Sequence, residues 1–205
     1  SLVLIGGEPG VGKSTLLLEI ARSFAGKFIY FSGEESPAQI KMRAGRMEVS
    51  GERLLLSRET RIDSILETIL AQRPDLVAVD SMQTIAGSHS AGSVSQMKEA
   101  ALSLMELCKA EMIPVIVTGH ITREGSIAGP KMLEHMVDVV LSFETDRLNH
   151  YRILRAMKNR FGPVGEVAIF EMATKGLKAL RSVEIARSKT PQSGRTFSAY
   201  QEGSR

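Results

Sequence analysis

A glycine-rich segment at residues 7–14, GEPGVGKS, limits the folds open to this chain more than any other stretch. It follows the apolar run at residues 2–5 and precedes a helix-like stretch at residues 15–21, so a strand, a loop and a helix are expected in succession. Glycines let the backbone of such a loop fold tightly enough for its N–H groups to surround phosphate oxygens at the positive end of the helix. Glycine-rich turns can match this spacing by chance, but rarely between a strand and a helix. The sequence therefore predicts a phosphate-binding loop, or P-loop, that binds a nucleoside triphosphate.

Two residues at the end of this loop carry its chemistry. Lys13 would bring positive charge to the β- and γ-phosphates, and the hydroxyl of Ser14 can ligate Mg²⁺. The predicted cofactors are therefore ATP and Mg²⁺. The predicted nucleotide-binding residues are Gly7, Glu8, Pro9, Gly10, Val11, Gly12, Lys13, Ser14 and Thr15.

Composition is consistent with one α/β domain. The chain has 205 residues, of which 43% are hydrophobic and 24% charged, and this is enough to bury a sheet. The formal net charge of +3 permits an acidic partner without identifying one. No apolar run approaches the roughly 20 residues that a membrane helix needs, so we expect no membrane partner and a cytoplasmic location. Cys108 is the single cysteine, which excludes an internal disulfide and favours a buried thiol.

The order of apolar runs predicts the fold. Through the first two-thirds of the chain they alternate with helical periodicity, which is typical of βαβ units around a mostly parallel, buried sheet. After about residue 136 short runs separated by turns predict an antiparallel meander. We expect one domain at residues 1–180, and a flexible or non-native tail at residues 181–205, where the sequence is polar and without periodicity. The expected strands cover residues 28–31, 54–56, 76–79, 114–118, 137–143, 151–157 and 167–171, and the expected helices cover residues 37–47, 62–72 and 94–111.

An acidic residue follows the apolar run at residues 76–79. Strands of a parallel α/β sheet present their ligands at the carboxyl end, which is where Asp80 is expected. We interpret Asp80 as a metal residue that, with Ser14, holds Mg²⁺ directly or through water. The alternative is an aspartate that only ends a strand.

Two further acids follow the predicted strand at residues 28–31. ATP hydrolysis needs a carboxylate that orients or deprotonates water, and Glu34 and Glu35 would both lie near the γ-phosphate. Either glutamate could instead be a favourable charge at the start of the next helix. We favour Glu34 as the catalytic carboxylate and Glu35 in the helix-cap role, beside the expected N-cap residue Ser36.

A pair of cations ends the predicted strand at residues 151–157. Lys158 and Arg160 point the same way in an extended chain. They could simply be solvated, as charged residues at strand ends usually are. In a P-loop ATPase, however, an arginine presented to the γ-phosphate of a neighbouring subunit can raise the rate by roughly 10³ to 10⁵. We therefore interpret the pair as candidate catalytic residues that act across a subunit interface.

Together these motifs resemble the ATPase core of the bacterial RadA (Sms) family, which are RecA-like DNA repair and recombination proteins. The resemblance covers residues 1–180 and is most specific at residues 152–172, RILRAMKNRFGPVGEVAIFEM. It implies a RecA-type hexameric ring that hydrolyses ATP between subunits and moves on single-stranded DNA to drive branch migration. Full members also carry an N-terminal four-cysteine zinc module and a C-terminal domain similar to the Lon protease. Neither is found in these 205 residues, so no zinc site is predicted.

The resemblance also assigns residues. It implies that Lys13 and Ser14 are the Walker A pair, Asp80 is the Walker B acid and Glu34 is the catalytic glutamate. Lys158 and Arg160 match the cations of the family's KNRFG segment. His120, which ends the run after Pro114, stands where RecA-like proteins place a polar sensor of the γ-phosphate.

Two glycine-bearing loops resemble the DNA-binding loops of the RecA family, at residues 86–93 and 121–131. Arg123 and Lys131 in the second loop would contact phosphates, whereas the first could equally be a plain linker. The expected partners are single-stranded or branched DNA, further copies of the chain in a homo-hexamer and, as a candidate, RecA recombinase. The alternatives are a DNA-independent KaiC-like ATPase, a nucleoside kinase and a ring-assembly module switched by ATP.

Overall fold

The structure is a computed structural model that describes residues 1–120, 132–146 and 151–180 of the chain. Its strands are β1 (Leu2–Gly7), β2 (Phe28–Ser32), β3 (Leu54–Ser57), β4 (Leu76–Asp80), β5 (Val115–His120), β6 (Val139–Thr145), β7 (Tyr151–Asn159), β8 (Val167–Ala173) and β9 (Gly176–Leu180). Its helices are α1 (Lys13–Ser23), α2 (Pro37–Arg46), α3 (Ile62–Gln72), α4 (Val94–Glu111) and α5 (Met132–Met136), with a short 3₁₀-helix, η1, at Met82–Thr84.

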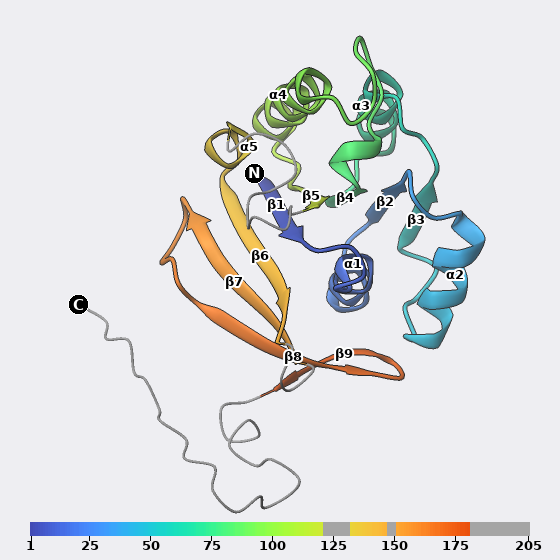
Figure 1. The fold of residues 1–205 in the computed structure, drawn as a ribbon. Coiled ribbons are helices and arrows are strands. Elements are labelled where there is room, and N and C mark those ends of the chain that lie inside the picture. Colours follow the sequence, from blue (N-terminus) through green and yellow to red (C-terminus); the bar gives the residue numbers. More distant parts are fainter. Residues whose placement is uncertain (121–131, 147–150, 181–205) are drawn as a thin grey trace, which may run out of the picture.

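The strands form one sheet in the order β3-β2-β4-β5-β1-β6-β7-β8-β9 (Figure 1). From β3 to β6 each strand runs parallel to its neighbours, whereas β7, β8 and β9 continue the sheet in antiparallel pairs. This confirms the predicted α/β fold, with a mostly parallel sheet followed by an antiparallel meander. β6 belongs to both parts, because it pairs in parallel with β1 and antiparallel with β7.

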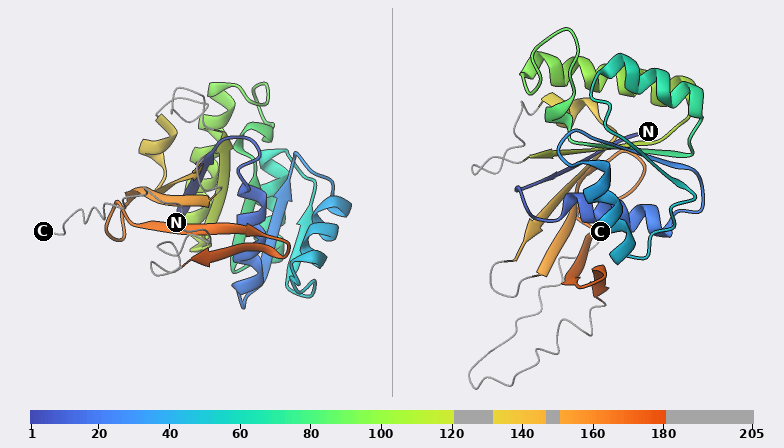
Figure 2. Two further views of the ribbon diagram at one scale, coloured as in Figure 1. Left: turned by 60° about the horizontal axis from the view of Figure 1, so that its bottom comes forward. Right: turned by 90° about the vertical axis from the view of Figure 1, so that its right-hand side faces the viewer.

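Helices cover both faces of the parallel part of the sheet (Figures 1 and 2). α3 and α4 pack on one face, and α1 and α2 pack on the other. Successive residues of a strand face opposite sides, so in β4 Val77 and Val79 join the core beneath α3 and α4, while Leu76 and Ala78 join the core beneath α1 and α2. Burial on both faces explains why these strands read as apolar runs in the sequence.

The start of α2 follows the sequence prediction. Pro37 is the first helical residue, and the side chain of Ser36 accepts a hydrogen bond from the backbone N–H of Gln39. The side chain of Gln39 accepts in return from the backbone N–H of Ser36 at 2.9 Å, which completes a capping box. This cap fixes the point at which the chain turns from β2 into α2, directly after Glu34 and Glu35.

Two elements go beyond the sequence prediction. α5 has five residues, which is too few for a hydrophobic repeat to be visible. β9 begins at Gly176, whose φ of 120° favours glycine, and the Leu177 N–H donates to Glu19 of α1 at 3.0 Å. The predicted tail at residues 181–205 lies outside the described residues. In the described part of the chain, none of the helices combines the length and apolar character needed to cross a membrane.

Strand register brings the predicted site residues together. Gly7 lies opposite His120 where β1 pairs with β5, and Ser32 lies opposite Asp80 where β2 pairs with β4. The carboxyl ends of parallel strands meet at one edge of the sheet. The loop after β1, the acid that ends β4 and the histidine that ends β5 therefore share that edge.

Candidate functional site

The shape of the P-loop depends on its glycines. Gly10 and Gly12 have φ angles of 79° and 109°, which residues with a Cβ rarely adopt. At Gly7 a Cβ would collide with a backbone carbonyl oxygen of β6. Arg152 of β7 holds the loop from outside, because its Nε donates to the carbonyl oxygen of Val11 at 2.8 Å. The side chain of Val11 is buried in the core, so its contribution to the loop is structural.

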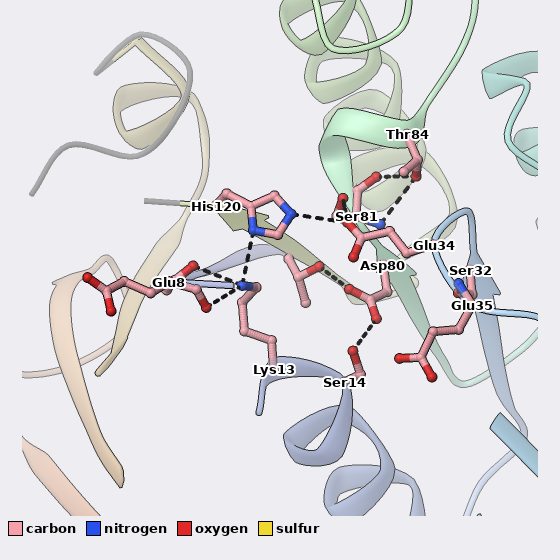
Figure 3. Close-up of polar contacts among 12 residues, drawn as sticks. Glu8, Lys13, Ser14, Ser32, Glu34, Glu35, Asp80, Ser81, Thr84 and His120 are labelled. Atoms are coloured by element: carbon pink, nitrogen blue, oxygen red, sulfur yellow. Dashed lines mark hydrogen bonds and ion pairs between the residues drawn. The ribbon is translucent and has the colours of Figure 1, made fainter. Parts of the chain in front are cut away.

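Lys13 begins α1, and only 6% of its surface is exposed. Its Nζ donates to the carbonyl oxygens of Gly7 at 2.8 Å and Glu8 at 3.1 Å, and lies 3.4 Å from Nδ1 of His120 (Figure 3). Burial lowers the pKa of Lys13, although nearby carboxylates partly oppose this. The ammonium therefore stands at the positive end of α1, where an anion gains both charge and backbone N–H donors.

Asp80 is buried and accepts hydrogen bonds from three hydroxyl groups. Its Oδ2 accepts from Ser14 at 2.7 Å and from Tyr30 at 2.6 Å, and its Oδ1 accepts from Thr118 at 2.6 Å. Burial, followed by the charge of Asp80, raises the pKa of Tyr30 well above its usual value, so the phenol remains a donor. These bonds fix both carboxylate oxygens at the edge of the sheet.

The donor set at Asp80 fits magnesium. Mg²⁺ prefers oxygen ligands and is usually bound through one or two carboxylates together with substrate phosphates. The Asp80 carboxylate and the Ser14 hydroxyl supply two such oxygens side by side. Among the described residues no group of three or more His, Cys, Asp or Glu side chains converges on a metal position. Asp80 and Ser14 could hold Mg²⁺ together with water and the phosphate oxygens of a nucleotide.

Glu34 reaches from the end of β2 toward His120 and Ser81 (Figure 3). Ser81 Oγ donates to Glu34 Oε1 at 2.6 Å, and His120 Nε2 lies 3.2 Å from the same oxygen. The ammonium of Lys13 can only donate, so the Nδ1 that faces it acts as an acceptor. The ring proton is then on Nε2, from which it donates to Glu34. The imidazole of His120 thus links the P-loop lysine to the candidate catalytic carboxylate.

A pocket of about 300 Å³ opens beside these groups, and two of its lining residues were not predicted. Arg43 of α2 forms a two-pronged ion pair with Glu35, at 2.9 and 2.7 Å. Glu35 therefore pairs with a later turn of α2, and Ser36 rather than Glu35 caps that helix. Met172 enters from β8 and would lie 3.1 Å from a Cβ at Gly12. The predicted residues in the lining are Pro9, Gly10, Gly12, Lys13, Ser14, Thr15, Glu34, Asp80 and His120.

The remaining predicted catalytic and DNA-binding residues lie elsewhere. Lys158 donates to backbone carbonyl oxygens at the end of α5, and Arg160 pairs with Asp138 at 3.1 Å. Among the described residues of this single chain, neither cation is part of the pocket lining. Arg123 and Lys131, predicted to bind DNA, lie outside the described residues.

The first predicted DNA loop, residues 86–93, is tied to α4. Ser93 caps that helix by accepting from the N–H of Gln96 at 3.2 Å. The buried Gln96 side chain in turn accepts from the N–H of His89 at 2.8 Å. The loop is therefore held against the start of α4.

Comparison with known proteins places the chain in a family. The model of the AAA domain matches residues 1–126. Three curated relatives, each described as DNA repair protein RadA, align with the whole chain at 49% identity in Campylobacter jejuni, 47% in Listeria monocytogenes and 46% in Aquifex aeolicus. The alignments cover 48%, 47% and 48% of those proteins, respectively. The chain thus spans about half the length of the curated relatives it matches.

A solved structure with the same fold is that of a KaiC-like protein from the archaeon Pyrococcus horikoshii. It aligns with a TM-score of 0.70 over 88% of this chain and 89% of that one. The sequence identity of 16% limits this likeness to the fold. It supports the RecA-like arrangement of the sheet and helices.

Proposed function

The chain belongs to the AAA domain family and is a RadA-type protein, and from this we propose that it is the ATP-hydrolysing core of a DNA repair motor that moves on DNA and drives branch migration. The observation that carries the proposal is the convergence of Lys13, Asp80, Glu34 and His120 on one pocket. Each comes from a different strand end or loop, so their meeting is a property of the fold and not of local sequence.

Each of the polar residues that converge on the pocket would have a role in hydrolysis. Lys13 would exchange its carbonyl partners for the β- and γ-phosphates, while Ser14 and Asp80 hold the metal. Mg²⁺, when bound, neutralises charge on the phosphate oxygens. Glu34 would orient and deprotonate the attacking water, and His120 would report the γ-phosphate to Glu34 because it contacts both Lys13 and Glu34.

We also propose that the site is completed by a second copy of the chain in a hexameric ring. The hairpin that joins β7 to β8 exposes four apolar side chains, Met157, Phe161, Val164 and Val167, with exposed fractions of 58%, 70%, 61% and 44%. An exposed apolar cluster of this kind is typical of an interaction surface. Arg160 lies within it and would be carried to the neighbour's γ-phosphate, as arginine fingers are.

DNA is proposed to bind through Arg123 and Lys131, which follow His120 in the sequence. Their charges would pair with backbone phosphates and so give little sequence preference. Since the chain covers about half of its relatives, RecA recombinase and other partners of the whole protein belong to this proposal as well.

The test is ATP hydrolysis by this chain with and without single-stranded DNA, using Lys13→Ala as the blank. Stimulation by DNA above the blank supports a DNA-coupled motor. Turnover that is indifferent to DNA would instead favour a KaiC-like ATPase. A Lys13→Ala variant with normal turnover would contradict the P-loop assignment.

A mixing experiment tests the interface. Arg160→Ala should bind ATP normally and hydrolyse it slowly, and Glu34→Gln should also hydrolyse it slowly. Mixed rings contain sites that pair an intact Glu34 with an intact Arg160, so mixing should restore part of the activity. Mixed rings that stay as slow as either variant would exclude action in trans.

A further inference from the structure

The two cations of the KNRFG segment are held in different ways. We propose that Lys158 is a positioning residue: it fixes residues 134–138 and, through Asp138, orients Arg160, so that Arg160 alone of the pair acts at the subunit interface. The proposal rests on the interface role proposed above for Arg160.

Lys158 caps the carboxyl end of α5. The last carbonyl groups of a helix have no partner within it. Lys158 Nζ donates to the carbonyl oxygens of Glu134 at 2.7 Å, His135 at 3.2 Å and Val137 at 2.7 Å. An ammonium has three donors, so all of them are used here. A positive charge at this end of a helix also complements the helix dipole.

α5 depends on such a contact. It has five residues, whereas isolated helices shorter than about 12 residues are marginal in water. Its Leu133 is buried in the core beneath α4, which anchors one side. The cap supplied by Lys158 fixes the opposite, polar end, from which the chain continues into β6.

Asp138 connects this segment to Arg160 by hydrogen bonds. Its backbone N–H and its Oδ2 bond to the carbonyl oxygen and N–H of Leu2, at 2.9 and 3.0 Å. Its carbonyl oxygen accepts from the N–H of Arg160 and its Oδ1 from Nη1 of Arg160, both at 3.1 Å. Asp138 is therefore clamped between β1 and the end of β7, and it sets the direction of the arginine side chain.

Only Arg160 can leave its partner at little cost. Its side chain is 53% exposed, and Asp138 would keep its two bonds to Leu2 after the arginine moves. Removing Lys158 would instead strip three carbonyl oxygens of their donor at once. Arg160 can therefore turn toward a neighbouring subunit, whereas Lys158 stays bonded to the end of α5.

Amide hydrogen exchange tests the clamp independently of nucleotide or DNA. Lys158→Met keeps the length of the side chain and removes its donors, and we expect exchange in peptides covering residues 133–139 to become at least tenfold faster. Lys158→Arg, which retains donors, should stay closer to the native rate. Lys109→Met removes an exposed lysine of α4 and should change nothing there. Native exchange rates at residues 133–139 in Lys158→Met would overturn the proposal.

A double mutant tests the path through Arg160. If Lys158 acts only by orienting Arg160, then Lys158→Met combined with Arg160→Ala should hydrolyse ATP no more slowly than Arg160→Ala alone. Multiplied losses would mean that Lys158 acts on the phosphate itself, and would refute the proposal. An Arg160→Ala variant of native activity would refute the finger assignment, while the exchange data would still decide whether Lys158 fixes residues 134–138.

Discussion

Replacing Ser81 by alanine tests whether Glu34 is the catalytic carboxylate. Ser81 is fully buried beside Asp80, and its hydroxyl donates to Glu34 Oε1 at 2.6 Å. The backbone of Ser81 keeps its hydrogen bonds with Thr84 when the hydroxyl is lost. The substitution therefore removes one constraint on the orientation of Glu34 and leaves its charge in place.

The size of the effect follows from that contact. A hydrogen bond to a charged group contributes roughly 1.5–3 kcal/mol. The Glu34 side chain is 38% exposed, so water can replace part of this, and we expect about 1.4 kcal/mol to be lost from the orientation of the carboxylate. Since about 1.4 kcal/mol corresponds to a factor of ten, kcat should fall roughly tenfold. The affinity for ATP should not change, because Ser81 does not line the pocket in the described structure.

The assay is steady-state ATP hydrolysis, with nucleotide binding measured separately. Ser142→Ala is a matched control, because Ser142 is also buried and donates to a glutamate, Glu144, at 2.6 Å away from the pocket lining. The control should retain native kcat. A Ser81→Ala enzyme with kcat within twofold of native, or one that loses ATP affinity in place of kcat, would refute this account of Glu34.

Three other outcomes follow from the site. Thr118→Val removes a buried donor from Asp80 at nearly constant volume, so the free energy of unfolding should fall by about 1–3 kcal/mol, and an unchanged denaturant midpoint would contradict the burial argument. Burial lowers the pKa of Lys13 below 10.5, and phosphate binds the ammonium form, so ATP affinity should decline as the pH rises through that lowered pKa. The affinity of Lys13→Met should not decline in this way. If the native protein and Lys13→Met show the same pH dependence of ATP affinity, Lys13 is excluded as its cause. Arg123→Ala should reduce the log–log salt slope of single-stranded DNA binding by about 0.7, and an identical slope would remove Arg123 from the DNA contact.

The sequence predicts those parts of the site whose signal is local. The P-loop is a continuous motif, and Asp80 follows four apolar residues that become β4. Parallel strands bring their carboxyl ends to one edge, so Lys13, Asp80 and Glu34 could be expected together, and the resemblance to the RadA family adds His120 to them.

The residues that the sequence does not predict are those whose partners lie far along the chain. Tyr30 sits in an apolar strand, and nothing local indicates that its hydroxyl reaches Asp80 fifty residues later. Arg43 pairs with Glu35 across eight residues, which matches no helical spacing of three or four. Met172 lines the pocket from β8, far along the chain from the P-loop.

Lys158 shows the limit of reading a motif by charge alone. The predicted strand at residues 151–157 stops one residue before Lys158, whereas β7 extends to Asn159 and includes it. The alternation of an extended chain also pairs the lysine with Arg160 as two equivalent cations. Their partners differ because α5, a helix too short to predict, ends beside the lysine, and Asp138 stands beside the arginine. The two cations of the motif are no longer equivalent, because all three donors of Lys158 are bonded to backbone oxygens. Mutations at the two positions should therefore differ in kind, with loss of local order at residue 158 and loss of transition-state charge at residue 160.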